Sequence, residues 1–554
     1  MTLLSEILAR RMQLPQPRTL DVVCRRDLAA AMDDGAVLLA DRWVARDTEG
    51  VPQPTVLVRS PYGRRQLVGV LFGRLLAERG LQVVIQSVRG TFGSGGRFSP
   101  FDERTDGLAT LRWLRAQPWH TGPVGTIGPS YLGFVQWAIA ADAGEDLGAM
   151  AIQVSASQFH GQTYAGDSIS LENVASWMVI IAAQDRRLGL VAINRGLRRL
   201  PALLGALPLG DLDERATGAA VDWFQEAFAN PARDQPYWSR RDFAASVAQV
   251  TAPVQFVGGW YDILLPWMLE DHAALAAAGR SPQLLIGPWA HTSPGLVGAG
   301  EREGLAWLRA HLLGDGRLVR PSPVRVMVTG ERSGGGWRDL SAWPPPGTRQ
   351  RRLYLGERRS LGEAPSGPGA DGYRYDPADP TPSLGGPVLL SQAAVVDNAP
   401  LEARADVLAY TGPVLGATVE AIGPVAVELW LRAGEPYVDL FARVCDVDAA
   451  GVSRNVCDAL TSVAPGRYED AGDGRRRVTF SLWPMGHRFA AGHRIRLLIA
   501  SGAHPRYARN PGTGADPATA TAAQMRPVDV EILWGAGHPS ALVLPAGGQY
   551  GRLY

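Results

Sequence analysis

Three residues that could together form a nucleophilic catalytic group each follow a short apolar run typical of a β-strand. Ser130 comes after VGTIGP, Asp262 after PVQFVGGWY and His291 after PQLLIGPWA. A serine hydroxyl attacks a carbonyl carbon efficiently when a histidine removes its proton and a carboxylate holds the histidine in the required tautomer. We therefore predict that Ser130 is the nucleophile, His291 the general base and Asp262 the carboxylate that orients His291.

The segment GPSYLG at positions 128–133 joins a predicted strand to a predicted amphipathic helix. This order is that of a nucleophile elbow, in which small flanking residues allow the serine to adopt a strained turn. The start of the helix adds positive potential near the hydroxyl and near the oxyanion that forms beside it. The second glycine stands at position 133, one residue later than in the general G-x-S-x-G pattern. The alternative is that Ser130 only caps the helix.

The choice of acid and base rests on where functional side chains lie in a parallel sheet, namely in loops just beyond the carboxyl ends of the strands. His291 is the histidine that directly follows a predicted strand. Asp262 has the alternative role of closing an Asx turn after its glycine-rich strand. The rival histidines precede the elbow, lie near a predicted domain boundary or fall in helical patterns: His120, His160, His272 and His311.

The elements that must position these residues alternate between strand and helix. Short β-rich runs and helical patterns follow one another from about Thr55 to Leu147 and again after Thr251, which is typical of parallel βαβ units. The two segments predict the halves of one doubly wound sheet, and the chain order Ser, Asp, His is the order found in α/β-hydrolases. Residues 157–246 have helical and loop patterns with few strand signals, so we predict an inserted helical cap.

A proline break at 343–347 separates this region from a series of short β patterns such as VAVELWLRA, RRVTFSLW and HRIRLLIAS. Turns at short intervals between such runs are typical of an antiparallel sandwich or jelly roll. The predicted fold is therefore an α/β-hydrolase domain with an inserted helical cap and a C-terminal β-sandwich. The predicted limits are 1–156 and 247–350 for the hydrolase domain, 157–246 for the cap and 351–554 for the jelly roll.

The composition is that of an ordinary globular enzyme or binding protein, because 46% of the 554 residues are apolar, 20% are charged and the net charge is +1. This balance indicates no nucleic-acid partner. The 55 basic residues are all arginine, which excludes a Schiff-base lysine, a P-loop lysine and a Ser-Lys dyad. We predict no cofactor and no metal site, since the three cysteines, at 24, 445 and 457, lack metal-ligand spacing.

The N-terminal segment places Glu6 inside its apolar run and its arginines after that run, which is the reverse of a secretory signal. No stretch approaches the roughly 18 uncharged apolar residues that a membrane helix needs. We therefore expect a cytoplasmic protein with no membrane partner.

Several motifs in addition to the elbow follow one another along nearly the whole chain. They are SPY at 60–62, RG at 89–90 with a downstream SGG, GWYD at 259–262, GPWAH at 287–291, YDPADPTPSLGG at 375–386 and GHRI at 492–495. In this order the motifs resemble those of the CocE/NonD hydrolases, a family that includes cocaine esterase-like enzymes, α-amino acid ester hydrolases and X-Pro dipeptidyl peptidases.

The resemblance implies the same fold that the patterns predict, and it matches Ser130, Asp262 and His291 to the family's catalytic positions. It further implies that the Tyr62 hydroxyl and the Tyr131 backbone N–H form the oxyanion hole. Without the resemblance, Tyr62 would be interpreted as a packing residue. The residues that fall where relatives line the acyl pocket are equally plausible as ordinary core residues: Trp177, Leu264, Leu389 and Leu390.

The predicted activity is hydrolysis of an ester, or of an amide, through an acyl-enzyme. Related amino-ester hydrolases hold a substrate ammonium with carboxylates, whereas Asp262 is followed here by ILL at 263–265, so we expect a neutral apolar acyl group unless Asp167 or Glu172 supplies charge. The alternatives are an X-Pro dipeptidyl peptidase, an acyltransferase, and a carbohydrate- or ligand-binding protein with a vestigial triad. The expected partner is a small-molecule ester or amide substrate, and a homodimer is left open.

Overall fold

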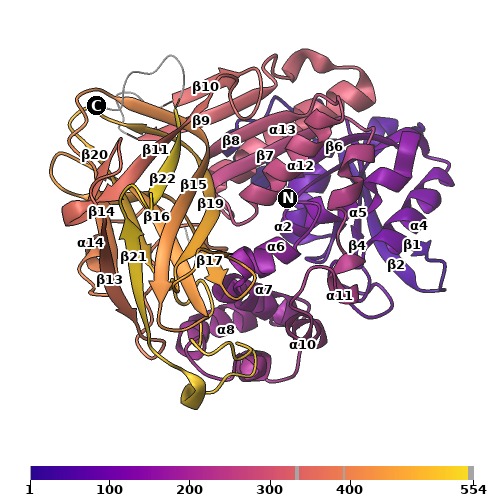
Figure 1. Cartoon of the computed structure of the whole chain (residues 1–554). Coiled ribbons are helices and arrows are strands. Elements are labelled where there is room, and N and C mark those ends of the chain that lie inside the picture. Colours follow the sequence, from indigo (N-terminus) through magenta and orange to yellow (C-terminus); the bar gives the residue numbers. More distant parts are fainter. Residues whose placement is uncertain (1, 331–335, 391–393, 547–554) are drawn as a thin grey trace.

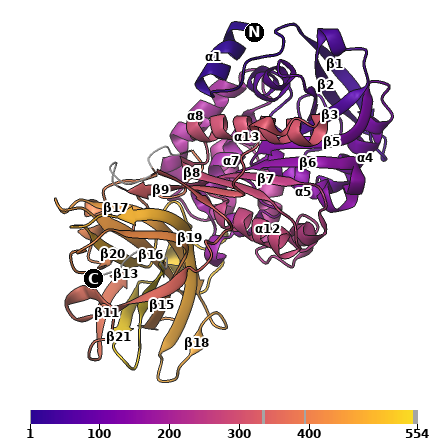
Figure 2. The same cartoon turned by 90° about the horizontal axis from the view of Figure 1, so that it is seen from above.

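The computed structural model describes residues 2–330, 336–390 and 394–546. These residues form a central sheet covered by helices, a helical region inserted into that unit, and a β-rich C-terminal region (Figure 1). Seen from above, the β-rich region lies on one side of the helix-covered sheet, and the N-terminal helix α1 (Thr2–Arg11) lies at the end away from it (Figure 2).

The central sheet has the strand order β1-β2-β4-β3-β5-β6-β7-β8-β9-β10. The strands from β4 to β9 in this order run parallel, while β1, β2 and β10 add antiparallel pairs at the two edges. The strands span Val22–Ala31 (β1), Val37–Ala45 (β2), Gln53–Ser60 (β3), Gln82–Ser87 (β4), His120–Pro129 (β5), Leu147–Gln153 (β6), Val254–Tyr261 (β7), Gln283–Ala290 (β8), Val324–Gly330 (β9) and Gly336–Leu340 (β10).

Helices cover both faces of this sheet because its strands are apolar on both sides, as buried parallel strands are. Neighbouring residues of β7 show the two faces. The Phe256 ring packs against Trp137 of α5 (Tyr131–Ala143), with ring centroids 6.0 Å apart. Val257 instead clusters with Leu296 and Ala299 of α13 (Pro294–Leu313). The doubly wound α/β class predicted from the sequence is therefore confirmed.

The other helices around the sheet connect its strands or follow its edges. A π-helical turn, Gly69–Arg74, lies between α2 and α3. The remaining helices outside the inserted region are α2 (Gln66–Val68), α3 (Leu75–Ala77), α4 (Arg104–Arg115), α12 (Leu265–Ala277) and α14 (Ala399–Glu402).

The inserted region between β6 and β7 is helical and has a core of its own. Its entry and exit are joined where the Phe243 N–H donates to the Ser157 carbonyl at 3.0 Å. Asp271 of α12 accepts hydrogen bonds from the Ser157 backbone N–H and from its hydroxyl, at 2.7 and 2.6 Å. The helices of this cap are α6 (His160–Thr163), α7 (Leu171–Ala183), α8 (Gly189–Leu203), α9 (Leu212–Thr217), α10 (Asp222–Ala229) and α11 (Pro236–Ser239).

The C-terminal region is built almost wholly of antiparallel strands, with β15 paired to β19, β21 and β22 and β16 paired to β17 and β20. It joins the central sheet where β19 pairs with β9. The predicted β-rich C-terminal domain is thus present, while its jelly-roll topology stays a prediction. The strands span Arg349–Gly356 (β11), Ser360–Gly362 (β12), Gly369–Tyr375 (β13), Leu408–Thr411 (β14), Val419–Ala433 (β15), Val438–Val447 (β16), Ser453–Val463 (β17), Glu469–Asp470 (β18), Arg476–Phe489 (β19), Arg494–Ala500 (β20), Val528–Trp534 (β21) and Ala541–Ala546 (β22).

Among the described residues, no helix combines the length and the apolarity needed to cross a bilayer.

The Asp271 contact at the base of the cap predicts a pH-dependent stability. Burial raises the pKa of Asp271 to about 8, far above the ~3.9 of an unfolded aspartate. At a pH between these two pKa values, Asp271 holds a proton in the folded protein and has lost it in the unfolded chain. The free energy of unfolding therefore falls as pH rises. We expect Asp271→Asn to reduce this fall by roughly 1 kcal/mol per pH unit, measured by urea unfolding between pH 5 and 8 at constant ionic strength. Asp234→Asn, which changes an exposed carboxylate, is the control, and equal slopes in all three proteins would contradict the prediction.

Candidate active site

Ser130 connects β5 to α5 in a strained turn with φ 56° and ψ −122°. A positive φ in a residue with a side chain costs on the order of 1–3 kcal/mol, so neighbouring groups must hold the turn. The Ser130 N–H donates to the Gln153 carbonyl at 2.9 Å, and the Ser155 hydroxyl donates to the Ser130 carbonyl at 2.6 Å. This is the strand-to-helix geometry of a nucleophile elbow.

The unusual place of the second glycine has a packing cause. A Cβ atom on Gly128 would lie 2.4 Å from the Leu132 Cβ, and a Cβ atom on Gly133 would lie 2.4 Å from the Ser155 Cβ. Position 133 therefore requires glycine because α5 begins in direct contact with the loop after β6. Position 132 faces a glycine and can carry a leucine.

His291 and Asp262 are in direct contact. The His291 Nδ1 lies 2.5 Å from the Asp262 Oδ2, and the Leu264 backbone N–H donates to the Asp262 Oδ1 at 2.8 Å. Asp262 has no exposed surface and His291 is 8% exposed. Because Nδ1 is the nitrogen that donates to the carboxylate, Nε2 is left to accept a proton.

Sheet order explains why these residues meet. Tyr261 pairs with Ala290 across β7 and β8, after a register shift that follows Gly259, so Asp262 and His291 leave adjacent strand ends together. Ser130 leaves β5, which lies two strands from β7 at the same edge. Of the described contacts, none is a hydrogen bond between Ser130 and His291. Such bonds are often long before substrate binds.

Tyr62 lies just beyond β3 with its hydroxyl held by the cap. The Trp177 Nε1–H of α7 donates to the Tyr62 hydroxyl oxygen at 3.0 Å. Burial raises the pKa of Tyr62 to about 12, so the phenol keeps its proton at neutral pH. Because the Tyr62 hydroxyl oxygen accepts the bond from Trp177, the hydroxyl proton can still be donated to another acceptor.

Tyr131 is the first residue of α5, and its backbone N–H therefore has no acceptor within the helix. Its side chain is buried and its hydroxyl donates to the Glu103 Oε1 at 2.6 Å. Glu103 is ion-paired with Arg59 at 2.8 Å, and both side chains are buried. Burial raises the pKa of Glu103, opposed by the charge of Arg59. This network fixes the residue next to Ser130 from outside the site.

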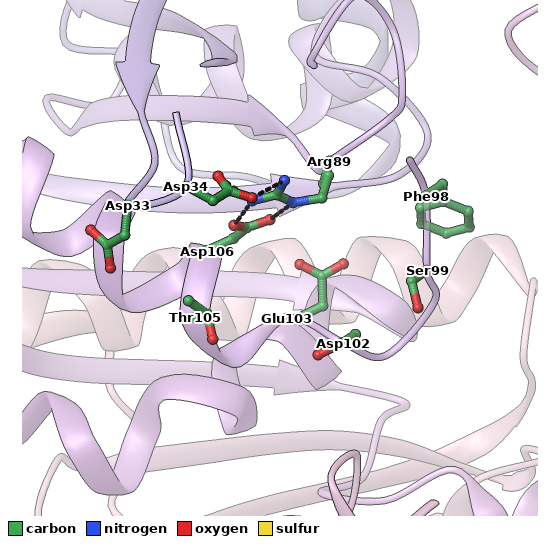
Figure 3. A pocket seen from close by; sticks show the side chains of 9 residues that line it. All are labelled: Asp33, Asp34, Arg89, Phe98, Ser99, Asp102, Glu103, Thr105 and Asp106. Atoms are coloured by element: carbon green, nitrogen blue, oxygen red, sulfur yellow. Dashed lines mark hydrogen bonds and ion pairs between the residues drawn. The ribbon is translucent and has the colours of Figure 1, made fainter. Parts of the chain in front are cut away.

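Glu103 also lines a polar hollow, together with Arg89 and several acidic side chains (Figure 3). Arg89 lies between Asp34 and Asp106 in this hollow and hydrogen-bonds both carboxylates. Arg89 thereby links β4's end to the turn after β1 and to α4 through these two carboxylates. Within the described part of the chain, no group of His, Cys, Asp and Glu side chains is arranged to hold a metal ion.

A narrow cavity of about 40 Å³ opens beside Ser130. Its lining comes from the β5–α5 elbow, the loop before α4, the loop after β7, the cap and the C-terminal region. Phe101 and Tyr131 stack against Trp177, with ring centroids 5.6 and 6.0 Å apart. The cavity is lined by Phe101, Ser130, Tyr131, Phe159, Gln162, Thr163, Asn173, Val174, Trp177, Trp223, Ala227, Tyr237, Trp238, Ile263 and Leu389, and none of these described residues is charged.

The four residues predicted for the acyl pocket divide into two pairs. Trp177 and Leu389 line the cavity, and the Leu389 N–H donates to the Asn173 Oδ1 at 2.9 Å. Leu264 is wholly buried in the hydrophobic core instead, and Leu390 is 38% exposed. Neither belongs to the described cavity lining, because a one-residue step along each segment turns the side chain away.

The two carboxylates considered as holders of a substrate ammonium lie elsewhere. Asp167 forms an ion pair with Arg467 of the C-terminal region at 2.8 Å. Glu172 precedes the cavity-lining Asn173 and does not itself line the cavity, and burial raises its pKa.

Comparison with known proteins is consistent with this geometry. Residues 34–293 match the model of the X-Pro dipeptidyl-peptidase (S15 family), and residues 318–543 match that of the X-Pro dipeptidyl-peptidase C-terminal non-catalytic domain. Cocaine esterase from Rhodococcus sp. (strain MB1 Bresler) is 29% identical over 93% of this chain and 97% of its own. The chain therefore carries an S15 domain followed by the matching C-terminal domain, and it is a serine hydrolase. The resemblance to CocE/NonD hydrolases stated from the motifs is thereby confirmed.

Solved structures show that the fold is shared. An aminopeptidase from a marine sediment archaeon, Thaumarchaeota archaeon, superposes with a TM-score of 0.81 at 21% identity, covering 96% of this chain and 97% of its own. An α-amino acid ester hydrolase superposes with a TM-score of 0.79 at 21% identity, and the match covers 96% of this chain and 98% of that protein's chain. The fold of this serine hydrolase is therefore shared with these solved structures.

Sequence reasoning missed a contact from the C-terminal region. The Trp483 Nε1–H of β19 donates to the Asp262 backbone carbonyl at 2.9 Å, across 221 residues of chain. Trp483 stands in RRVTFSLW, which reads as an ordinary strand, and no local pattern marks a partner so distant. In this serine hydrolase, the C-terminal region matched as non-catalytic thus holds the loop that carries Asp262.

This contact predicts that Trp483→Phe lowers kcat by roughly tenfold, because one net hydrogen bond to a buried group contributes ~1 kcal/mol and the loop loses its anchor. KM should change little, since Trp483 does not line the cavity. Ester hydrolysis measured at saturating substrate checks the prediction. The control is Trp534→Phe, which removes an indole hydrogen bond to Asp371 in the same region. Equal kcat values for the two variants would contradict a positioning role for Trp483.

Proposed function

We propose that this serine hydrolase is an esterase that transfers a neutral, apolar acyl group to Ser130 and then to water. The observation that carries the proposal is the uncharged aromatic cavity beside Ser130. Such a cavity binds an apolar group by removing it from water, and its described lining offers no oppositely charged side chain to an ammonium or a carboxylate.

In the proposed mechanism, the His291 Nε2 takes the proton from the Ser130 hydroxyl as its oxygen attacks the ester carbonyl. The Tyr62 O–H and the Tyr131 N–H donate to the oxyanion, and the imidazolium is stabilised by Asp262. The C–O bond to the alcohol then breaks, and the alcohol leaves with the proton from His291. Water, deprotonated by His291, releases the acid and restores Ser130. All of these groups come from one chain, so the proposed reaction requires no partner subunit.

A peptidase specific for an N-terminal X-Pro sequence is the second candidate, because the matched family model carries that description. Such an enzyme has to recognise the positive N-terminal amine of its substrate. The cavity lining supports the esterase over the peptidase, since Asp167 and Glu172, the carboxylates considered for holding an amine, do not line it. Hydrolysis of X-Pro p-nitroanilides at rates comparable to esters would favour the peptidase, and transfer of the acyl group to an added alcohol would favour an acyltransferase.

The mechanism is tested with p-nitrophenyl acetate and a fluorophosphonate probe, without added metal. We expect Ser130→Ala to lower kcat by about 10⁴-fold or more and to abolish labelling. Tyr62→Phe should lower kcat by about 10²-fold and keep the label, because it removes one oxyanion donor. Ser239→Ala, at an exposed serine, is the control for contaminating activity. Retention of most activity by Ser130→Ala would exclude the mechanism.

The acyl preference is tested with two isosteric substrates, the p-nitrophenyl esters of isobutyrate and of alanine. The second differs by an ammonium in place of a methyl group, and burying it without a partner costs several kcal/mol. After division by the spontaneous hydrolysis rates, we expect kcat/KM to favour isobutyrate by at least about tenfold. A preference for the alanine ester would mean that a carboxylate reaches the substrate.

A further inference from the structure

A second, larger hollow of about 750 Å³ lies on the other side of Tyr62. It is an open groove between the segment after β3 and the α7–α8 turn of the cap. We call it the Tyr62 groove; its lining includes Tyr62, Leu67, Ile180 and residues 184–191. It shares no lining residue with the cavity beside Ser130.

Tyr62 and α7 connect the groove to the cavity. Trp177 lines the cavity and bonds to the Tyr62 hydroxyl, while Ile180 and Gln184, three and seven residues further along α7, line the groove. This spacing places all three on one face of the helix. The Gln184 Nε2–H also donates to the Pro61 carbonyl at 2.8 Å. Tyr62 and α7 thus lie between the cavity beside Ser130 and the open groove.

The groove exposes large apolar side chains that would normally be buried. Leu67, Leu188, Leu190 and Val191 line it and are 57%, 69%, 73% and 63% exposed. An exposed cluster of this kind beside a site marks a surface that binds an apolar group. Its position suits an elongated substituent that the cavity of about 40 Å³ cannot hold.

The groove also carries positive charge. Arg186 and Arg187 line it, and among the described residues neither has a side-chain hydrogen bond or an ion pair. The other arginines of the groove, at 64 and 65, are paired with Asp27 and Asp41. Asp185 is the acidic residue of the lining, and it accepts a hydrogen bond from the Phe92 N–H at 2.8 Å. Two unpaired cations against one anion leave a net attraction for a negative group.

We propose that the Tyr62 groove binds the leaving group of the substrate, and that this leaving group is an apolar alcohol carrying a carboxylate. The proposal rests on the esterase function given above. The acyl group occupies the cavity, the carbon chain of the leaving group lies against the exposed leucines, and its carboxylate pairs with Arg186 and Arg187. On acyl transfer the C–O bond breaks, His291 protonates the departing oxygen, and the hydroxy acid leaves through the open side of the groove.

The test compares octyl acetate with the acetate ester of ω-hydroxyoctanoate, which differ only by a carboxylate far from the scissile bond. We expect kcat/KM, measured by acetate release, to be about fivefold higher for the carboxylate ester, the size of two exposed ion pairs. The double variant Arg186→Gln, Arg187→Gln should bring this ratio to about one, as should high salt. Arg198→Gln, an exposed arginine of α8 outside the groove, is the matched control and should keep the ratio.

Other outcomes separate the groove from the esterase function. p-Nitrophenyl acetate has no chain to place in the groove, so all these variants should hydrolyse it equally. A ratio unchanged in the double variant would overturn the proposal. The proposal would also be overturned if Arg186 and Arg187 raised kcat/KM for an ester that carries the carboxylate on its acyl chain and not on its alcohol. If no ester is cleaved, the esterase proposal fails, and calorimetric binding of ω-hydroxyoctanoate to the wild type but not to the double variant would still support the groove.

Discussion

The buried contact between Asp262 and His291 sets the conditions that the surrounding structure has to meet. A carboxylate without any exposed surface is costly unless its oxygens are hydrogen-bonded. Here one oxygen binds His291 and the other accepts the Leu264 N–H, while Trp483 holds the backbone of the same residue from the C-terminal region. The β7–β8 pairing brings the two side chains to adjacent strand ends. The central sheet and the C-terminal region therefore both contribute to one hydrogen bond.

The aromatic residues around Ser130 separate the cavity beside it from the Tyr62 groove. Trp177 is central to this division because its ring stacks on Tyr131 and its indole N–H binds Tyr62. Through the Trp177 side chain alone, the cap forms part of the cavity wall and holds the Tyr62 hydroxyl in place. On the opposite side, the buried Glu103 and Arg59 hold the Tyr131 hydroxyl. The result is a small closed cavity and a larger open groove, which differ in size, polarity and charge.

Most of the fold could be predicted because its elements have local signals. Alternating apolar runs mark the strands, and the 3.6-residue period marks α4, α5 and α12. The residues after β5, β7 and β8 could be singled out because functional side chains follow the carboxyl ends of parallel strands. Within the predicted helical cap, residues 173–193 form most of α7 and the start of α8, and the turn between these helices lines the groove. That turn had no sequence signal of its own.

The sequence by itself determined the fold class, the elbow at Ser130 and the strand-end positions of Asp262 and His291, since each depends on neighbours within a few residues. The tertiary structure alone decided that Leu389 reaches the cavity while Leu264 and Leu390 do not line it. It also decided that Trp177 holds Tyr62 and that Trp483 holds the Asp262 loop. These contacts join segments more than a hundred residues apart. Their formation depends on how the sheet, the cap and the C-terminal region pack together, and periodicity along the chain carries no information about that packing.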